Sequence, residues 1–219
     1  MIALAPSNEP VASAKSSPSA ESIYSRILSR PTGPAAGNQF TTHILACALT
    51  IGLIEARETG ISVSAALGLD RASLAALTDQ WAPAARDLFD LASQPEAVSL
   101  DEEEEQLHQL LTHFSVDSSP LCGWITAIVA RRAMSPRHLW QDLGLLERRE
   151  LTQLMNDWFP TLAAANTDNM KWKKFFYRKL CELEGFSLCA APTCRECGDF
   201  DNCFGEEDGV SALARLSRR

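Results

Sequence analysis

The sequence lacks the patterns that define several large classes of protein. Its longest apolar stretch, Ile44 to Ile54, covers 11 residues. A helix that spans a bilayer needs about 20, so we expect no transmembrane segment. The start, MIALAPSNEP, has no basic region and no long apolar core, so we expect no secretory signal there. No Ser-His-Asp order, P-loop or glycine-rich dinucleotide motif occurs, so nothing indicates hydrolase or nucleotide chemistry.

Strand patterns are also missing. No alternating Val-, Ile- and Thr-rich run is bounded by turn residues, and no repeat of about 20–50 residues is present. The apolar share of 46% is ordinary for a globular protein. We therefore predict an all-α protein with a single helical domain and an irregular C-terminal cysteine loop. The expected divisions are a disordered Ala/Ser/Pro-rich tail over 1–20, the helical domain over 21–188, the cysteine loop over 189–205, and a C-terminal tail or short helix over 206–219.

Capping residues indicate where several helices begin. The expected N-caps are Asp70, Ser99, Ser119 and Ser135, and the last two precede a proline at the first helical position. We expect the last long helix to run from about residues 166–168 to residue 184. Four of its apolar residues should face the core at helical spacing: Trp172, Phe176, Leu180 and Leu183.

Charge is unevenly distributed along a chain whose net charge is −8. Residues 61–130 hold most of the acidic excess, and the run from Asp101 to Glu105 is interpreted as a solvated helix face. This charge argues against nucleic-acid binding through that half of the chain. Residues 131–188 are basic overall, and we interpret Arg148, Arg149 and Glu150 as a charged helix face.

The seven cysteines divide into two groups. Cys47 and Cys122 lie singly in apolar surroundings, where a cysteine usually acts as a small buried hydrophobe. The other five lie close together: Cys181, Cys189, Cys194, Cys197 and Cys203. The odd total and the lack of an export signal favour a reducing cytoplasm. There, thiolates serve metal or redox chemistry more often than a disulfide framework.

Four cysteines in the segment CAAPTCRECGDFDNC, from Cys189 to Cys203, have the spacing C-x4-C-x2-C-x5-C. Pro, Gly, Asp and Asn between them allow a short loop to wrap one centre. Thiolate donors select zinc, Cu(I) or iron–sulfur clusters. Structural zinc usually uses two short chelating pairs, and only Cys194 and Cys197 form such a pair here. The spacing favours an iron–sulfur cluster, with zinc and a redox dithiol as alternatives.

Three stretches resemble the NifQ family: HLWQDLGL (138–145), NMKWKKFFYRKLCELEGFSLC (169–189) and AAPTCRECGDFDNCFG (190–205). The resemblance is clear over about residues 131–205 and weak before residue 40. It implies a role in nitrogen fixation, in the biosynthesis of the iron–molybdenum cofactor of nitrogenase. It also implies that Cys189, Cys194, Cys197 and Cys203 bind an iron–sulfur cluster, of 4Fe–4S type or a Mo–Fe–S species that has incorporated molybdenum.

The resemblance further implies a carrier protein without catalytic activity. Such a carrier takes molybdenum from molybdate or another source and donates it to the nitrogenase iron protein and the NifEN cofactor scaffold. We expect a cytoplasmic protein with no nucleic-acid or membrane partner. One alternative is a helical interaction or regulatory module with a structural zinc site made of four cysteines, and a second is a small electron carrier.

Five residues near the cysteine loop are candidate accessory groups. Lys171, Lys174 and Arg178 share a helix face, which is either a solvated stripe or a surface that attracts molybdate, offsets cluster charge or docks an acidic partner. Cys181 is either a structural cysteine or a fifth thiolate ligand. His138 is either a residue that hydrogen-bonds locally in the first turn of a helix or a nitrogen ligand for molybdenum.

Overall fold

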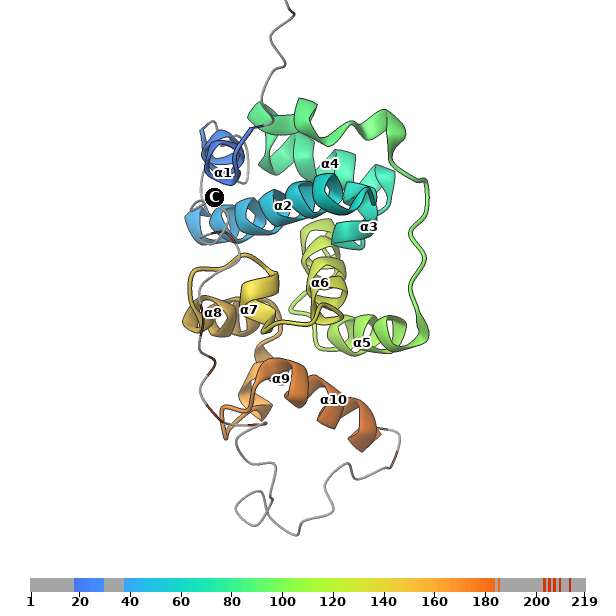
Figure 1. Ribbon diagram of the computed structural model, residues 1–219. Helices are drawn as coiled ribbons and strands as arrows, with labels where there is room; N and C mark the ends of the chain where they lie inside the picture. The colour runs from blue at the N-terminus through green and yellow to red at the C-terminus, as the bar shows by residue number, and fades with distance from the viewer. Residues whose placement is uncertain are drawn as a thin grey trace, which may run out of the picture.

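The computed structural model describes residues 18–29 and 38–183, together with Gly185, Cys203, Gly205, Glu207, Gly209 and Leu213. All regular elements in these residues are helical (Figure 1), so the all-α prediction is confirmed. The α-helices are α1 (Ala20–Leu28), α2 (Gln39–Thr59), α3 (Val63–Leu67), α4 (Arg71–Trp81), α5 (Glu102–His113), α6 (Pro120–Ala133), α7 (Leu139–Asp142), α8 (Arg148–Trp158), α9 (Pro160–Ala165) and α10 (Trp172–Leu183). Two 3-10 helices, η2 (Pro83–Phe89) and η3 (Leu91–Ser93), lie between α4 and α5.

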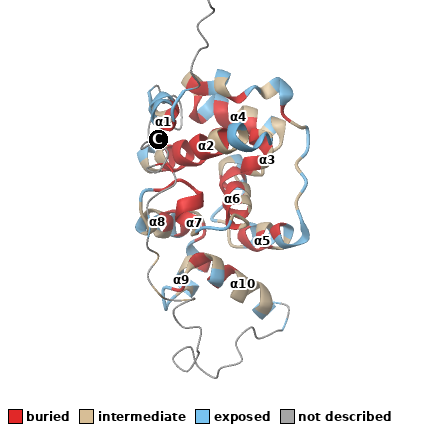
Figure 2. Ribbon diagram, in the orientation of Figure 1, coloured by how far each residue is buried: buried red, intermediate tan, exposed pale blue. Residues whose placement is uncertain are grey.

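Helix α2 forms the centre of the core. All its residues from Ile44 to Leu53 are buried, and Figure 2 shows this buried stretch crossing the middle of the molecule. Helices α1 and α3 pack against it. Within the described part of the chain, α2 is the one helix long and apolar enough to cross a membrane. Because 67% of its apolar window is buried inside the protein, its composition fits the central helix of a folded domain.

Two of the four predicted helix starts are confirmed and two are wrong. Asp70 and Ser119 cap α4 and α6 by accepting hydrogen bonds from the backbone N–H groups at the third helical position. The predicted cap Ser99 is wrong. Asp101 caps α5 instead, and its carboxylate accepts from the N–H of Glu104 at 2.8 Å. A carboxylate at this position also interacts favourably with the helix dipole.

The predicted start at Ser135 is also wrong. Residues 134–137 form a turn, and α7 begins at Leu139 with His138 as its N-cap residue. The ammonium of Lys173 donates a hydrogen bond to the carbonyl of Ser135, so this carbonyl of the turn is paired with a side chain of α10. Gly144 ends the α7 region with φ 76°, and a Cβ there would lie 2.6 Å from Ile51. Glycine therefore allows α7 to pack closely on α2.

The last helix is shorter than predicted. Residues 166–171 form a turn in which the side chain of Asn166 accepts from the N–H of Met170 at 2.8 Å, so α10 begins at Trp172. Trp172 and Phe176 are buried as predicted, and Leu180 packs partly against the core. The prediction for Leu183 is wrong, because it is 68% exposed at the end of the helix.

The acidic run is only partly a solvated face. Glu102, Glu103 and Glu105 are exposed, but Glu104 is buried, and its carboxylate lies 2.8 Å from the guanidinium of Arg131. Burial raises the pKa of Glu104, and the charge of Arg131 opposes that rise. The run therefore contributes a buried ion pair between α5 and α6 as well as surface charge.

Candidate functional site

Cys203 is the one predicted cluster ligand within the described residues, since Cys189, Cys194 and Cys197 lie outside them. Its side chain is half-buried and packs against the hydrophobic core. Its carbonyl oxygen accepts a hydrogen bond from the backbone N–H of Lys171 at 2.8 Å. The Cys203 backbone is thereby fixed beside the start of α10. Figure 1 shows that α10 and α1 lie at opposite ends of the molecule.

Cys181 lies near the other end of α10, and its side chain is half-buried. A helix rises about 1.5 Å per residue, so Cys181 is about 15 Å along the axis from Lys171, which holds the Cys203 backbone. The described structure therefore does not bring Cys181 and Cys203 together, and a ligand role for Cys181 stays a prediction.

His138 hydrogen-bonds locally as expected, because its carbonyl accepts from the N–H groups of Gln141 at 2.9 Å and Asp142 at 3.0 Å. Its side chain makes a long-range contact as well. Its Nδ1 lies 3.3 Å from Oε1 of Glu207, and Oε2 of Glu207 lies 2.7 Å from Nε of Arg148. The Glu207 side chain is only 5% exposed. Leu213 is also buried and belongs to the core. Glu207 and Leu213 thus both contact the helical body.

Arg148 was predicted to lie on a charged helix face, and that interpretation is wrong. Besides facing Glu207, its guanidinium donates hydrogen bonds to the carbonyls of Asn169 at 3.0 Å and Met170 at 3.2 Å. Arg149, the next residue, does match the interpretation, because 84% of its side chain is exposed. Arg148 therefore connects α8 to the turn that precedes α10.

The predicted basic face of α10 is only partly available to a ligand. Lys174 is exposed and Lys171 is half-buried. Arg178 pairs with Glu182 at 2.9 Å, and Lys179 pairs with the same carboxylate at 2.7 Å. A pocket of about 100 Å³ lies between this face and the α9–α10 turn, lined by Ala165, Asn166, Thr167, Asp168, Met170, Phe175, Arg178, Lys179 and Glu182. Because carboxylates and cations both line the pocket, its charge does not select an anion.

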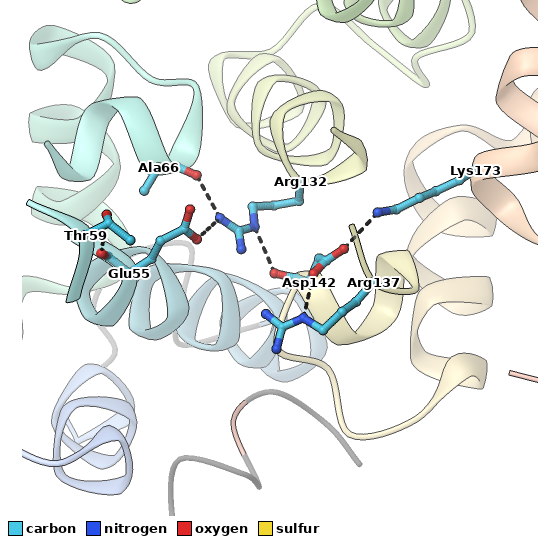
Figure 3. A network of polar contacts seen from close by, with 7 residues as sticks. All are labelled: Glu55, Thr59, Ala66, Arg132, Arg137, Asp142 and Lys173. Carbon is cyan, nitrogen blue, oxygen red and sulfur yellow. Dashed lines mark hydrogen bonds and ion pairs between the residues drawn. The ribbon is translucent and has the colours of Figure 1, made fainter. Parts of the chain in front are cut away.

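A buried polar network joins two of the stretches that carry the family resemblance (Figure 3). Asp142, from the stretch 138–145, is completely buried. Its carboxylate accepts from Nζ of Lys173 at 2.8 Å and from Nε of Arg137 at 3.1 Å. Its carbonyl accepts from Nε of Arg132 at 2.9 Å. The network thereby fixes α10, and the Cys203 anchor at its start, to the centre of the protein.

Arg132 extends the network to α2 and α3. Its side chain is 3% exposed, and its guanidinium contacts the carboxylate of Glu55 and the carbonyl of Ala66. Burial lowers the pKa of Lys173, and its hydrogen bond to Asp142 opposes that change. A buried charge is tolerated only when it is paired, so each member depends on the others.

Within residues 18–29 and 38–183 and the isolated described positions, no group of three His, Cys, Asp or Glu side chains can hold a metal ion. Cys47 does not offer a thiolate, because burial, and secondly the charge of Glu150, raise the pKa of its thiol. Cys122 is also buried, so the interpretation of both as core residues is confirmed. The described thiols that fit a soft metal centre are the partly accessible ones, Cys181 and Cys203.

Comparison with known proteins assigns the chain to a family. A family model described as NifQ matches residues 44–205. The chain belongs to the NifQ family. A protein named "Protein NifQ homolog" from Sinorhizobium fredii is 41% identical over 174 residues, which are 79% of this chain and 75% of that protein. "Protein NifQ" of Rhodobacter capsulatus is 40% identical over 177 residues, 80% of this chain and 95% of the relative.

A third relative, "Protein NifQ" of Azotobacter vinelandii, is 37% identical over 140 residues, 64% of this chain and 68% of that protein. No solved structure matches the chain. The NifQ family acts in the biosynthesis of the nitrogenase iron–molybdenum cofactor and in molybdenum handling. Membership therefore confirms the predicted family and its broad role in nitrogen fixation.

Sequence reasoning missed several residues that fix the site. Asp142 has one visible signal: it is the only charged residue of the HLWQDLGL stretch, in which leucines and a tryptophan flank it. Glu207 has none, because acidic residues surround it in the sequence and its partners lie far away. A second, half-buried cluster was also missed: the hydroxyl of Tyr24 lies 2.7 Å from Nδ1 of His43, whose Nε2 lies 3.3 Å from Glu150. This cluster ties α1 to α2 and α8.

Proposed function

We propose that this chain is an iron–sulfur carrier protein that donates molybdenum for assembly of the nitrogenase iron–molybdenum cofactor. Cys189, Cys194, Cys197 and Cys203 would hold the cluster. The observation that carries the proposal is the C-x4-C-x2-C-x5-C spacing in a chain of the NifQ family. The partial exposure of Cys203 supports it, because a thiolate ligand must be accessible to the metal.

The cargo in this proposal is an iron–sulfur cluster that incorporates molybdenum as a Mo–Fe–S species. Thiolates suit the iron and sulfide part of such a cluster. The chain's own part is to supply thiolates from a loop and to hold the Cys203 end of that loop against a packed helical body. A loop ligand set on a body with its own core suits a carrier, since losing the cargo need not unfold the protein.

The proposed partners follow from the same role. A molybdate or other molybdenum source loads the protein, and the nitrogenase iron protein and the NifEN scaffold receive the metal. We place this exchange in the cytoplasm, where thiols stay reduced. Nucleic acid and membrane have no part in it. The chain acts as a carrier, and no catalytic residues are assigned.

Metal analysis of anaerobically purified protein tests the proposal. The expected preparation is brown, contains iron and acid-labile sulfide in similar amounts, and gains molybdenum when molybdate is supplied. A colourless protein with about one zinc per chain would instead support a structural zinc site with four cysteine ligands in an interaction module. A protein that cycles between redox states without ever taking up molybdenum would be an electron carrier.

Two cysteine variants make this test specific. Cys203→Ser removes a proposed ligand, while Cys181→Ser removes the other described thiol that is half-buried. We expect Cys203→Ser to lose iron and sulfide and Cys181→Ser to retain them. Equal retention by both variants would contradict the assignment of Cys203. Circular dichroism of each variant should match that of the unaltered chain, because serine differs from cysteine by a single atom and leaves the helical core packed.

A further inference from the structure

Glu207 lies four residues after Cys203 and is held in a buried ion-pair arrangement. Its carboxylate faces Nε of Arg148 at 2.7 Å and Nδ1 of His138 at 3.3 Å, with only 5% of its side chain exposed. Burying a carboxylate is costly unless cations or donors surround it. These contacts join the described part of the C-terminal segment to α7 and α8, which are distant in sequence.

Arg148 links this carboxylate to the attachment point of Cys203. The same guanidinium donates to the carbonyls of Asn169 and Met170 at 3.0 and 3.2 Å. The next residue, Lys171, donates its backbone N–H to the carbonyl of Cys203 at 2.8 Å. One arginine therefore holds both the turn that binds Cys203 and the carboxylate that follows it.

Leu213 adds a third attachment, because it is 7% exposed and belongs to the hydrophobic core. The Cys203 backbone, the Glu207 carboxylate and the Leu213 side chain all contact the helical body within eleven positions. Such a series of contacts restricts the positions that the Cys203 thiol can take. Ligands held in place by surrounding contacts bind a metal more tightly than mobile ones.

We infer that Glu207 is a positioning residue for Cys203, acting through Arg148 and His138, and we call this set of three the Glu207 clasp. The inference rests on the proposed function in that it takes Cys203 as a cluster ligand. The clasp keeps the Cys203 end of the cysteine loop on the body, so this thiol stays available to the cargo. Loss of the clasp leaves the thiol chemically intact but no longer fixed, which weakens retention of the cargo.

The first experiment measures the clasp without any metal. Hydrogen–deuterium exchange of the metal-free chain reports on the peptide that covers residues 169–173, in which the N–H of Lys171 donates to the carbonyl of Cys203. We expect Glu207→Gln and Arg148→Gln to lose protection in this peptide. Arg149→Gln is the matched control, because it removes the same charge from the neighbouring, exposed position. It should leave this peptide unchanged.

The second experiment measures retention of the cargo. Iron release from the loaded protein to an excess of chelator should be roughly tenfold faster in Glu207→Gln and Arg148→Gln, since loss of a supporting residue weakens metal sites by about that factor. Arg149→Gln should release iron at the unaltered rate. A purely structural Glu207 would lower the unfolding midpoint but leave the iron-release rate of the folded protein unchanged.

The outcomes separate this inference from the proposed function. If both clasp variants match the unaltered chain in exchange and in iron release, the inference is overturned. If exchange changes but release does not, Glu207 anchors the segment without positioning a ligand, and the inference also fails. If the purified chain carries zinc, the proposed function fails, and zinc release then decides the role of Glu207. Should Arg148→Gln not fold, the near-isosteric Glu207→Gln still gives both measurements.

Discussion

The carboxylate of Asp142 and the ammonium of Lys173 form an ion pair of 2.8 Å in which Asp142 is completely buried. The two residues are 31 positions apart and come from α7 and α10. Their pairing fixes α10 to the helices around α2, and Lys171, the residue just before α10, binds the Cys203 backbone. The buried network, rather than α10 alone, therefore sets where the candidate ligand lies.

Removing Asp142 should strongly destabilise the protein. In Asp142→Ala, the cations of Lys173 and Arg137 lose the carboxylate that both of them contact. Breaking a buried pair costs about 3–5 kcal/mol, because an uncompensated charge remains. Urea denaturation of the metal-free chain measures this loss. Lys173→Met should also destabilise, whereas Lys174→Met, at the exposed next position, should change the free energy of unfolding by less than about 0.5 kcal/mol. Equal effects at 173 and 174 would contradict the network.

The two tyrosines should ionise at unusually high pH. Burial is the main cause that raises the pKa of Tyr24 to about 12, and burial followed by the hydrogen bond to Glu103 does the same for Tyr177. Because these are the only tyrosines in the chain, tyrosinate absorbance of the folded protein reports both. We expect little absorbance change near pH 10, the usual pKa, and a rise near pH 12. In Tyr24→Phe the amplitude should halve.

The same raised pKa values determine how stability depends on pH. The stabilising contribution of each protonated tyrosine is fully present below about pH 10, the pKa in the unfolded chain, and is lost as pH rises through about 12. Stability should therefore fall between these values, and less steeply in Tyr24→Phe. A fall of equal slope in both proteins would contradict the placement of Tyr24.

Alkylation should sort the described cysteines by burial. In the folded, metal-free chain, iodoacetamide should modify Cys181 and Cys203, which are partly accessible, and leave Cys47 and Cys122 unmodified. Cys47 is further protected because burial raises the pKa of its thiol and keeps it protonated. Peptide mass spectrometry before and after unfolding gives the result. Modification of Cys47 in the folded state would contradict its burial in the core around α2.

The basic face of α10 should assist molybdenum loading. Replacing Lys171, Lys174 and Arg178 with glutamine should slow molybdenum uptake at low salt, and added salt should reduce the difference. A control with the same charge change replaces exposed arginines elsewhere: Arg57, Arg86 and Arg149. If both triple variants load equally, the face is a solvated surface. Because Arg178 already pairs with Glu182, we expect Lys174 to contribute the most.

Local patterns in the sequence were enough to predict much of the fold. Ser119 followed by Pro120 marks the start of α6, since capping and proline geometry act within one turn. The same pattern at Ser135 failed, because Lys173 binds the Ser135 carbonyl and the chain turns there. The exposure of Leu183 was missed for a related reason: helical spacing shows which residues share a face, but not where the neighbouring helices end.

The candidate site was predicted less completely. The cysteine spacing points to metal chemistry by itself, because thiolates so close together have few other uses. The partners of Glu207 could not be predicted, because Arg148 and His138 approach it only after α7 and α8 have packed. Asp142 is similar: its pairing with Lys173 depends on the position of α10 and leaves no periodic signal. Long-range polar contacts of this kind appear only in the folded arrangement.

Donation of molybdenum by this chain can be measured as transfer of the metal to an acceptor. Protein loaded anaerobically with molybdenum is mixed with the NifEN scaffold and the nitrogenase iron protein, separated again, and each fraction is assayed for molybdenum. We expect molybdenum to leave the unaltered chain and to appear on the acceptor fraction, while Cys203→Ser supplies none and Cys181→Ser behaves as the unaltered chain. Molybdenum that never binds, or that stays on the chain with both acceptors present, would contradict the account.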